Sequence, residues 1–131
     1  HTKLFGSWKA KYMDYSTEQD IRQPMAAAFM ICAELLRKID NMDERFRMFF
    51  NDVDICKKVY DAGFKIRFLP ASVVIHEHGV SIKKDRANMI KVWNEDCAIY
   101  FEKHFGGGLP LLWLRVNLKI SGIIRVFLAK K

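Results

Sequence analysis

The segment 49–68, FFNDVDICKKVYDAGFKIRF, decides the local fold around it. An apolar residue recurs every three or four positions between 53 and 60, which is typical of a helix with one buried face. The polar pair Asn51-Asp52 stands where a helix N-cap is expected, and Gly63 stands where a left-handed residue ends a helix. Apolar and basic residues then alternate from 64 to 68, so the segment predicts a helix followed by a half-buried strand.

Outward from this segment, the apolar pattern predicts three more helices and one more strand. A short helix is expected over 33–39, and longer helices over 85–105 and 109–131, separated by a run of three glycines. Residues 73–75 are expected to form a second short strand. Residues 1–23 are polar and mixed, and we expect them to be irregular or partly helical.

The overall composition is that of a globular chain. It has 131 residues, of which 50% are hydrophobic and 13% aromatic, and this excludes a disordered or low-complexity protein. The length corresponds to one domain. The net charge of +7 is uneven, because residues 109–131 carry five basic side chains and no acid. A basic tail of this kind points to an anionic partner.

The cysteines and the chain start indicate the cellular setting. Cys32, Cys56 and Cys97 are an odd number without C-x-x-C spacing, which argues against a disulfide framework and a four-cysteine zinc site. We expect reduced, buried thiols in a cytoplasmic protein. The chain begins with neither Met nor an apolar leader, so we also expect it to be part of a longer protein.

Residues 109–131 are amphipathic at the helical period. Arg115, Lys119 and Gly122 share one narrow face. The broad apolar face opposite comprises Trp113, Val116, Ile120, Ile123, Ile124 and Phe127. The helix could lie in the headgroup plane of an anionic membrane, or it could pack its apolar face on protein outside this chain. Both interpretations stay open, and the expected membrane or partner contacts are Trp113, Arg115, Lys119 and Arg125. Because the aromatic residues lie on the apolar face, no nucleic-acid partner is expected.

Two short motifs carry side chains suited to chemistry. Asp52-Val53-Asp54 could bind a hard cation or provide a general base, although two acids in the first turn of a helix are more often simple capping residues. His76-Glu77-His78 follows the second expected strand, where residues two apart project to the same face. The two imidazoles could therefore hold one metal ion, and the alternative is an exposed polar strand end.

Six short strings occur in a fixed order between residues 25 and 80. They are Ala27-Ala28-Phe29-Met30-Ile31, Asp43-Glu44-Arg45-Phe46, Phe49-Phe50-Asn51-Asp52-Val53-Asp54-Ile55-Cys56, Ala62-Gly63-Phe64-Lys65-Ile66, Pro70-Ala71 and Val74-Ile75-His76-Glu77-His78-Gly79. Together they resemble the C-terminal half of family 2 glycosyltransferases, in the rhamnosyltransferase-like and galactofuranosyltransferase-like branch with the GT-A fold. The resemblance covers residues 25–105, and the order of the strings is far more specific than any one of them.

The resemblance implies roles for the matching residues. Asp52 would be the general base that activates the acceptor hydroxyl. His76, with His78 nearby, would help to hold the divalent metal of the complete enzyme, Mn²⁺ or Mg²⁺. The implied substrate-binding residues are Ala27, Ala28, Phe29, Asn51 and Asp54, the last by orienting its neighbours at the helix start.

Three departures from the family pattern concern the cleft. Asn51 stands where the family usually has Glu, Asp40-Asn41-Met42 where it has Gly-Gly-Phe, and Ala27-Ala28 where it has Gly-Ala. The first would alter the charge beside the base, and the others would narrow the cleft. The family's metal-binding Asp-x-Asp normally ends a buried strand, whereas Asp52-Val53-Asp54 opens a helix. The order of the motifs therefore favours the base position for Asp52.

The resemblance also implies an organisation and an activity. The fold would be α/β, with residues 1–108 as the acceptor-side half of a partial GT-A (Rossmann-like) domain and 109–131 as a basic amphipathic C-terminal helix. The N-terminal nucleotide-binding half would be missing from this chain, which alone would be inactive. The complete enzyme would move a sugar, with inversion, from a nucleotide-sugar donor to a saccharide or lipid-linked saccharide acceptor in cell-surface polysaccharide synthesis. It would be cytoplasmic and peripheral on the inner face of the cell membrane.

Two other functions are consistent with the sequence. One is a non-catalytic membrane- or partner-binding module that uses residues 109–131. The other is a small metal-dependent hydrolase built on Asp52, Asp54, His76 and His78. A half-domain with a bare apolar face could also self-associate to cover it.

Overall fold

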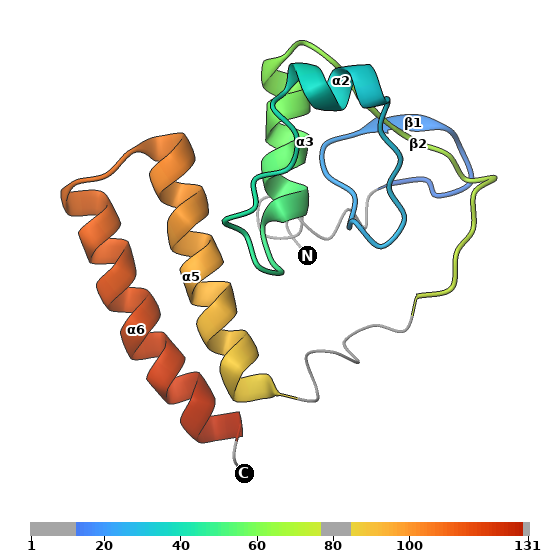
Figure 1. Ribbon diagram of the computed structural model, residues 1–131. Helices are drawn as coiled ribbons and strands as arrows, with labels where there is room; N and C mark the ends of the chain where they lie inside the picture. Colours follow the sequence, from blue (N-terminus) through green and yellow to red (C-terminus); the bar gives the residue numbers. More distant parts are fainter. Residues whose placement is uncertain (1–12, 77–84, 130–131) are drawn as a thin grey trace.

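The computed structural model describes residues 13–76 and 85–129 and combines helices with a small sheet (Figure 1). In chain order the elements are β1 (Gln19–Ile21), α2 (Ala33–Lys38), α3 (Asn51–Asp61), β2 (Ile66–Phe68), α5 (Arg86–Phe105) and α6 (Leu109–Ala129). Figure 1 shows α5 and α6 as an antiparallel hairpin, beside a unit made of α2, α3 and the two strands. The chain therefore belongs to the mixed α/β class in this general sense.

The sheet consists of β1 and β2, paired antiparallel with Gln19 opposite Phe68 and Ile21 opposite Ile66. The strand expected over 64–68 is confirmed in its second half. The expectation that residues 1–23 are irregular or partly helical is wrong for 19–21, because these residues become a strand by pairing with β2. Asp20 reinforces the pairing through ion pairs with Lys65 at 2.8 Å and Arg67 at 3.3 Å.

The second expected strand, residues 73–75, is wrong. These residues have no regular secondary structure, and the side chains of Val73 and Ile75 are 83% and 99% exposed. A strand needs a neighbouring strand to accept its backbone hydrogen bonds, and among the described residues none lies beside this segment. His76 therefore does not follow a strand, and His78 lies outside the described residues.

Helix α3 packs its apolar face into the main hydrophobic cluster. Its buried Ile55, Cys56 and Val59 contact Ile39, just after α2, and Ile66 of β2. The short helix expected over 33–39 is confirmed as α2, which brings Ile39 into this cluster. The cluster thus joins α2, α3 and the sheet into one unit.

The two ends of α3 differ from each other in how well the sequence predicts them. Gly63 ends the helix as expected, with φ +80° and its N–H on the Tyr60 carbonyl at 2.9 Å, while the Phe64 N–H reaches the Val59 carbonyl at 3.0 Å. At the start, Asn51 and Asp52 lie in the first turn and do not cap it. The N-cap is Phe50, whose φ of +62° is unusual for an aromatic residue.

The helical hairpin confirms both long helices of the sequence analysis. Asp85 caps α5 by accepting a hydrogen bond from the Asn88 N–H at 3.2 Å. Gly122 of α6 is buried against Asn94 of α5, and a Cβ at Gly122 would lie 2.6 Å from the Asn94 amide nitrogen. That amide nitrogen donates to the Leu118 carbonyl at 2.7 Å. A side chain at position 122 would therefore have to displace the Asn94 amide, and glycine lets the two helices approach this closely without that shift.

The orientation of α6 leaves its apolar face uncovered in this chain. Arg115 and Gly122, two of the three residues predicted to share the narrow face, are turned toward α5, where Arg115 pairs with Glu102 at 2.9 Å. Lys119 is exposed. The broad face is also exposed, and Trp113 at its N-terminal end is 70% exposed. Within the described residues, no helix combines the length and the apolar composition that a membrane crossing requires.

One buried carboxylate connects the hairpin to the rest of the molecule. Asp96, in the middle of α5, is 0% exposed. Its two oxygens accept hydrogen bonds from the backbone N–H groups of Arg47, Met48 and Phe49, at 3.3, 3.1 and 2.8 Å. The turn that precedes α3 is thereby fixed against α5.

We expect Asp96→Ala to lower the free energy of unfolding by about 3 kcal/mol, because the three N–H groups lose their acceptor in a water-poor environment. The matched control is Glu95→Ala, which removes only the exposed ion pair with Arg47 and should cost less than about 1 kcal/mol. Urea unfolding followed by circular dichroism measures both. Equal losses for the two variants would show that Asp96 does not connect the two parts.

Candidate functional site

Asp52 lies half-buried at the mouth of a small cavity beside the first turn of α3. The cavity has a volume of about 210 Å³ and is lined by Met48, Phe49, Phe50, Asp52, Val53 and Trp93. One carboxylate oxygen of Asp52 accepts the Val53 N–H at 2.9 Å. Among residues 13–76 and 85–129, no cationic side chain pairs with Asp52. Asp52 is therefore the acidic residue of a cavity whose other lining side chains are apolar or aromatic.

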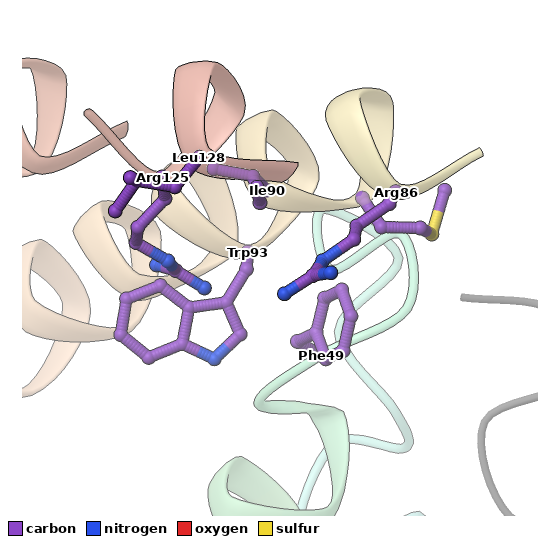
Figure 2. A pocket seen from close by; sticks show the side chains of 7 residues that line it. Phe49, Arg86, Ile90, Trp93, Arg125 and Leu128 are labelled. Carbon is purple, nitrogen blue, oxygen red and sulfur yellow. The ribbon is translucent and has the colours of Figure 1, made fainter. Parts of the chain in front are cut away.

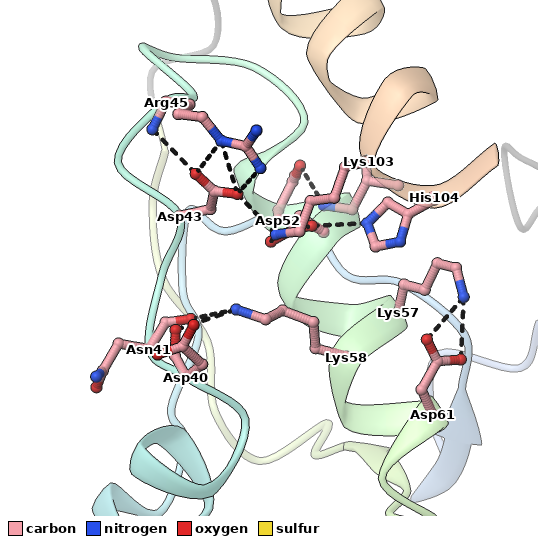
Figure 3. A network of polar contacts seen from close by, with 12 residues as sticks. Asp40, Asn41, Asp43, Arg45, Asp52, Lys57, Lys58, Asp61, Lys103 and His104 are labelled. Carbon is pink, nitrogen blue, oxygen red and sulfur yellow. Dashed lines mark hydrogen bonds and ion pairs between the residues drawn. The ribbon is translucent and has the colours of Figure 1, made fainter. Parts of the chain in front are cut away.

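Asp54, two residues later, has the opposite environment. It is 1% exposed, and its carboxylate contacts the Lys103 ammonium at 2.8 Å and the His104 ring nitrogen Nε2 at 2.7 Å (Figure 3). Residues two apart on a helix point to different sides, so Asp52 and Asp54 cannot share a ligand on the same face. Asp54 lies too deep to contact a substrate directly, and it holds the end of α5 against the start of α3.

Lys103 bridges Asp54 to a second acid, Asp43, whose carboxylate it contacts at 2.8 Å (Figure 3). Burial lowers the pKa of Lys103, but its hydrogen bonds to Asp43 and Asp54 outweigh this effect and hold the pKa above its ordinary value. Hydrogen bonds from Arg45, and then from Lys103, hold the pKa of Asp43 well below its usual range in spite of partial burial. These groups are thus charged at neutral pH and stabilise one another.

Phe50 and Trp93 form the aromatic wall of the Asp52 cavity. The Phe50 ring lies 5.4 Å from the Trp93 ring and 5.6 Å from the Tyr100 ring, both on α5. These contacts explain how Phe50 keeps its left-handed backbone conformation, because the packing compensates for the strain. The cavity is therefore built across α3 and α5 and would not exist in either helix alone.

The other residues predicted for the site lie away from this cavity. Ala27 and Ala28 are exposed, and Phe29 packs on the main hydrophobic cluster. Asn51 is adjacent to the site, since its side-chain oxygen accepts the Asp52 N–H at 2.8 Å. The cavity lining includes none of these four residues.

The predicted metal ligands are not assembled in the described part of the chain. His76 is exposed, and His78 lies outside the described residues. Between residues 13 and 76 and between 85 and 129, no group of three or more His, Cys, Asp and Glu side chains is arranged to hold a metal ion. The residues described thus do not by themselves form a fitting site for Mn²⁺ or Mg²⁺.

In comparisons with known proteins, no family model, no curated protein and no solved structure matches the chain.

Several residues that shape the site escaped the sequence analysis. Asp96 had a detectable signal, because it lies three residues after Trp93 and four before Tyr100, on the apolar stripe of its helix. An acid on such a stripe indicates a buried carboxylate with polar partners. Lys103 and His104 carry no local signal, since Asp54 lies about fifty residues earlier in the chain.

The prediction of buried thiols holds for one cysteine and is wrong for another. Cys56 is buried and Cys97 half-buried, whereas Cys32 is exposed, because it lies just before α2 on the solvent side. Burial, with a smaller contribution from the Asp52 charge, raises the pKa of Cys56 to about 11. Burial also raises the pKa of Cys97. Cys56 and Cys97 are therefore protonated and unreactive at neutral pH.

We expect the stability of the chain to fall as the pH drops below about 4, the ordinary pKa of an Asp side chain in an unfolded chain. The folded-state pKa of Asp43 is depressed, so below that pH the unfolded chain takes up the proton first and unfolding becomes easier. Asp43→Asn should make this decline shallower, whereas Asp61→Asn, on an exposed acid paired with Lys57, should leave it unchanged. Urea midpoints measured across the acid range test this, and parallel profiles for wild type and Asp43→Asn would contradict it.

Proposed function

We propose that this chain is the acceptor half of an inverting glycosyltransferase with the GT-A fold, and that Asp52 is its general base. The ordered strings between residues 25 and 80 suggest the family, and the environment of Asp52 supports the role. The observation that carries the proposal is a half-buried carboxylate, without a cationic partner in the described residues, at the mouth of a cavity with aromatic walls. A general base must lie beside the substrate hydroxyl, and the place of Asp52 in the lining of the cavity supports this role.

In the proposed reaction, Asp52 takes the proton of the acceptor hydroxyl as its oxygen attacks the anomeric carbon of the donor sugar. The bond from that carbon to the nucleoside diphosphate breaks at the same time, so no covalent intermediate with the protein is needed. Trp93 and Phe50 provide the apolar walls on which the acceptor can rest while Asp52 orients it. Asp54 takes no part in proton transfer, because Lys103 and His104 already occupy its carboxylate.

In this proposal, the binding site for the nucleotide-sugar donor lies outside this chain. An N-terminal nucleotide-binding half would hold the nucleotide-sugar and, with it, most of the ligands of a divalent metal. Such a metal would neutralise the charge of the leaving diphosphate. The described residues provide no cluster for it, and no step assigned to Asp52 depends on it.

We also propose that the protein is peripheral on the cytoplasmic face of the cell membrane. The exposed apolar face of α6 supports this association, and so does the basic composition of residues 109–131. A non-catalytic membrane-binding module would use the same face of α6. The enzyme and the binding module differ in Asp52, which only the enzyme needs. The hydrolase alternative gains no support, because Asp52 and Asp54 lie on different sides of α3.

We expect Asp52→Asn, in the protein that includes the nucleotide-binding half, to reduce kcat about a hundredfold or more with little change in substrate KM, since only the proton acceptor is lost. Release of nucleoside diphosphate from a panel of nucleotide-sugars, with saccharide acceptors and Mn²⁺, is the measurement. The 131-residue chain alone should release none.

The matched control for this experiment is Asp61→Asn, at the other end of the same helix, where the acid is exposed and pairs with Lys57 at 2.7 Å. Its kcat should stay within about twofold of wild type, as for a surface substitution. Full activity in Asp52→Asn would remove the base from the proposal. Sugar transfer by the isolated chain would remove the requirement for a second half.

A further inference from the structure

A second cavity lies between the start of α5 and the end of α6, and it shares Phe49 and Trp93 with the adjacent cavity at Asp52 (Figure 2). Its volume is about 340 Å³, and it is lined by Phe49, Arg86, Met89, Ile90, Trp93, Arg125 and Leu128. Figure 2 shows the guanidinium groups of Arg86 and Arg125 turned toward the space above Trp93 and Phe49. The Arg125 guanidinium lies 5.3 Å from the centre of the Trp93 ring. Two cations from different helices therefore converge on one apolar floor.

Neither of these two arginines forms an ion pair in the described residues, in contrast to four other arginines. Arg45, Arg47, Arg67 and Arg115 each form an ion pair with an Asp or Glu side chain. Within the part of the chain that the structure describes, Arg86 and Arg125 form none, and no acid lines the cavity. Guanidinium groups without a counterion are well suited to bind phosphate, because each can donate two hydrogen bonds to its oxygens.

The cavity also opens onto apolar surface. Leu128 at its edge is 61% exposed, and the exposed side chains of Ile124 and Phe127 continue from it along the outer side of α6 toward Trp113. An exposed apolar surface of this extent is uncommon on a protein that only water contacts. The ligand that matches the whole feature is anionic at one end and hydrocarbon at the other.

We propose that Arg86 and Arg125 bind the phosphate group of an anionic phospholipid, while the outer face of α6 lies against the hydrocarbon of the same lipid layer. The charge complementarity selects a phosphate headgroup, and the adjoining apolar surface selects a lipid rather than a free anion. The site rests on the membrane association proposed above, and it gives that association a defined headgroup contact. It does not depend on Asp52 or on sugar transfer.

The test is co-sedimentation of the 131-residue chain with two kinds of vesicle, one of phosphatidylcholine alone and one of phosphatidylcholine mixed with phosphatidylglycerol. Wild type should bind the mixed vesicles at least about tenfold more tightly, as expected for two basic contacts near an anionic surface. Arg86→Gln with Arg125→Gln should remove most of this preference and leave binding to pure phosphatidylcholine unchanged. The matched control is Lys65→Gln with Arg67→Gln, just before β2 and within it. It removes the same charge at the sheet and should change the preference less than about threefold.

The outcomes separate the headgroup site from the wider association. Binding of wild type to neither vesicle overturns both the membrane association and the site. An unchanged preference in Arg86→Gln with Arg125→Gln, or an equal loss in the β2 control, overturns the site and leaves the association standing. The role of Asp52 in sugar transfer is tested separately, by release of nucleoside diphosphate. Failure of the glycosyltransferase proposal is therefore distinguishable from failure of the lipid site.

A soluble lipid places the contact at the cavity. Dihexanoyl-phosphatidylglycerol, kept below its micelle concentration, should shift the Trp93 indole N–H signal in the NMR spectrum of wild type, and the shift should be lost in Arg86→Gln with Arg125→Gln. The signal is assigned with Trp93→Phe. Inorganic phosphate should cause the same shift only at concentrations at least about tenfold higher, because it lacks the hydrocarbon. Equal affinity for inorganic phosphate would show a simple anion site and overturn the assignment to lipid.

Discussion

The contact between the Asp96 carboxylate and the backbone of residues 47–49 is the constraint on which the rest of the structure depends. It joins the middle of α5 to the turn before α3, although the two segments lie almost fifty residues apart in the chain. That turn carries Phe50 in a left-handed conformation, packed on Trp93 and Tyr100. Because Asp52 follows two residues later, the place of the proposed base is set by a carboxylate that never contacts a substrate.

The first turn of α3 shows how one helix gives two aspartates different properties. A buried charge is tolerated only when partners compensate for the loss of water, and Asp54 has two, Lys103 and His104. The helical period then turns Asp52 to another side, where it meets the aromatic wall of a cavity and no cation in the described residues. The enclosed acid fixes the geometry of the helix start, and the accessible acid is available for chemistry.

The hairpin of α5 and α6 is unusual because α6 exposes its broad apolar face. A helix on the surface of a water-soluble protein normally buries its apolar face and exposes its polar one. In α6, Leu111 is buried and Gly122 and Arg115 contact α5, while the broad apolar face is exposed. The exposed face connects the two proposals for the membrane side of the molecule, since lipid can cover it and the two arginines Arg86 and Arg125 can meet phosphate.

Local signals in the chain were enough to predict the helices at 33–39, 85–105 and 109–131, the helix end at Gly63 and the strand that became β2, because periodicity and capping depend on neighbouring residues. They also singled out Asp52, but spacing could not tell it from Asp54.

Strand formation at 19–21 and its failure at 73–75 depended on whether a second strand was available to accept hydrogen bonds. The partners of Asp54 and Asp96, and the convergence of Arg86 and Arg125, were decided only by tertiary structure. Each brings together residues that are tens of positions apart, and no pattern within one helix records which distant side chain will lie against it.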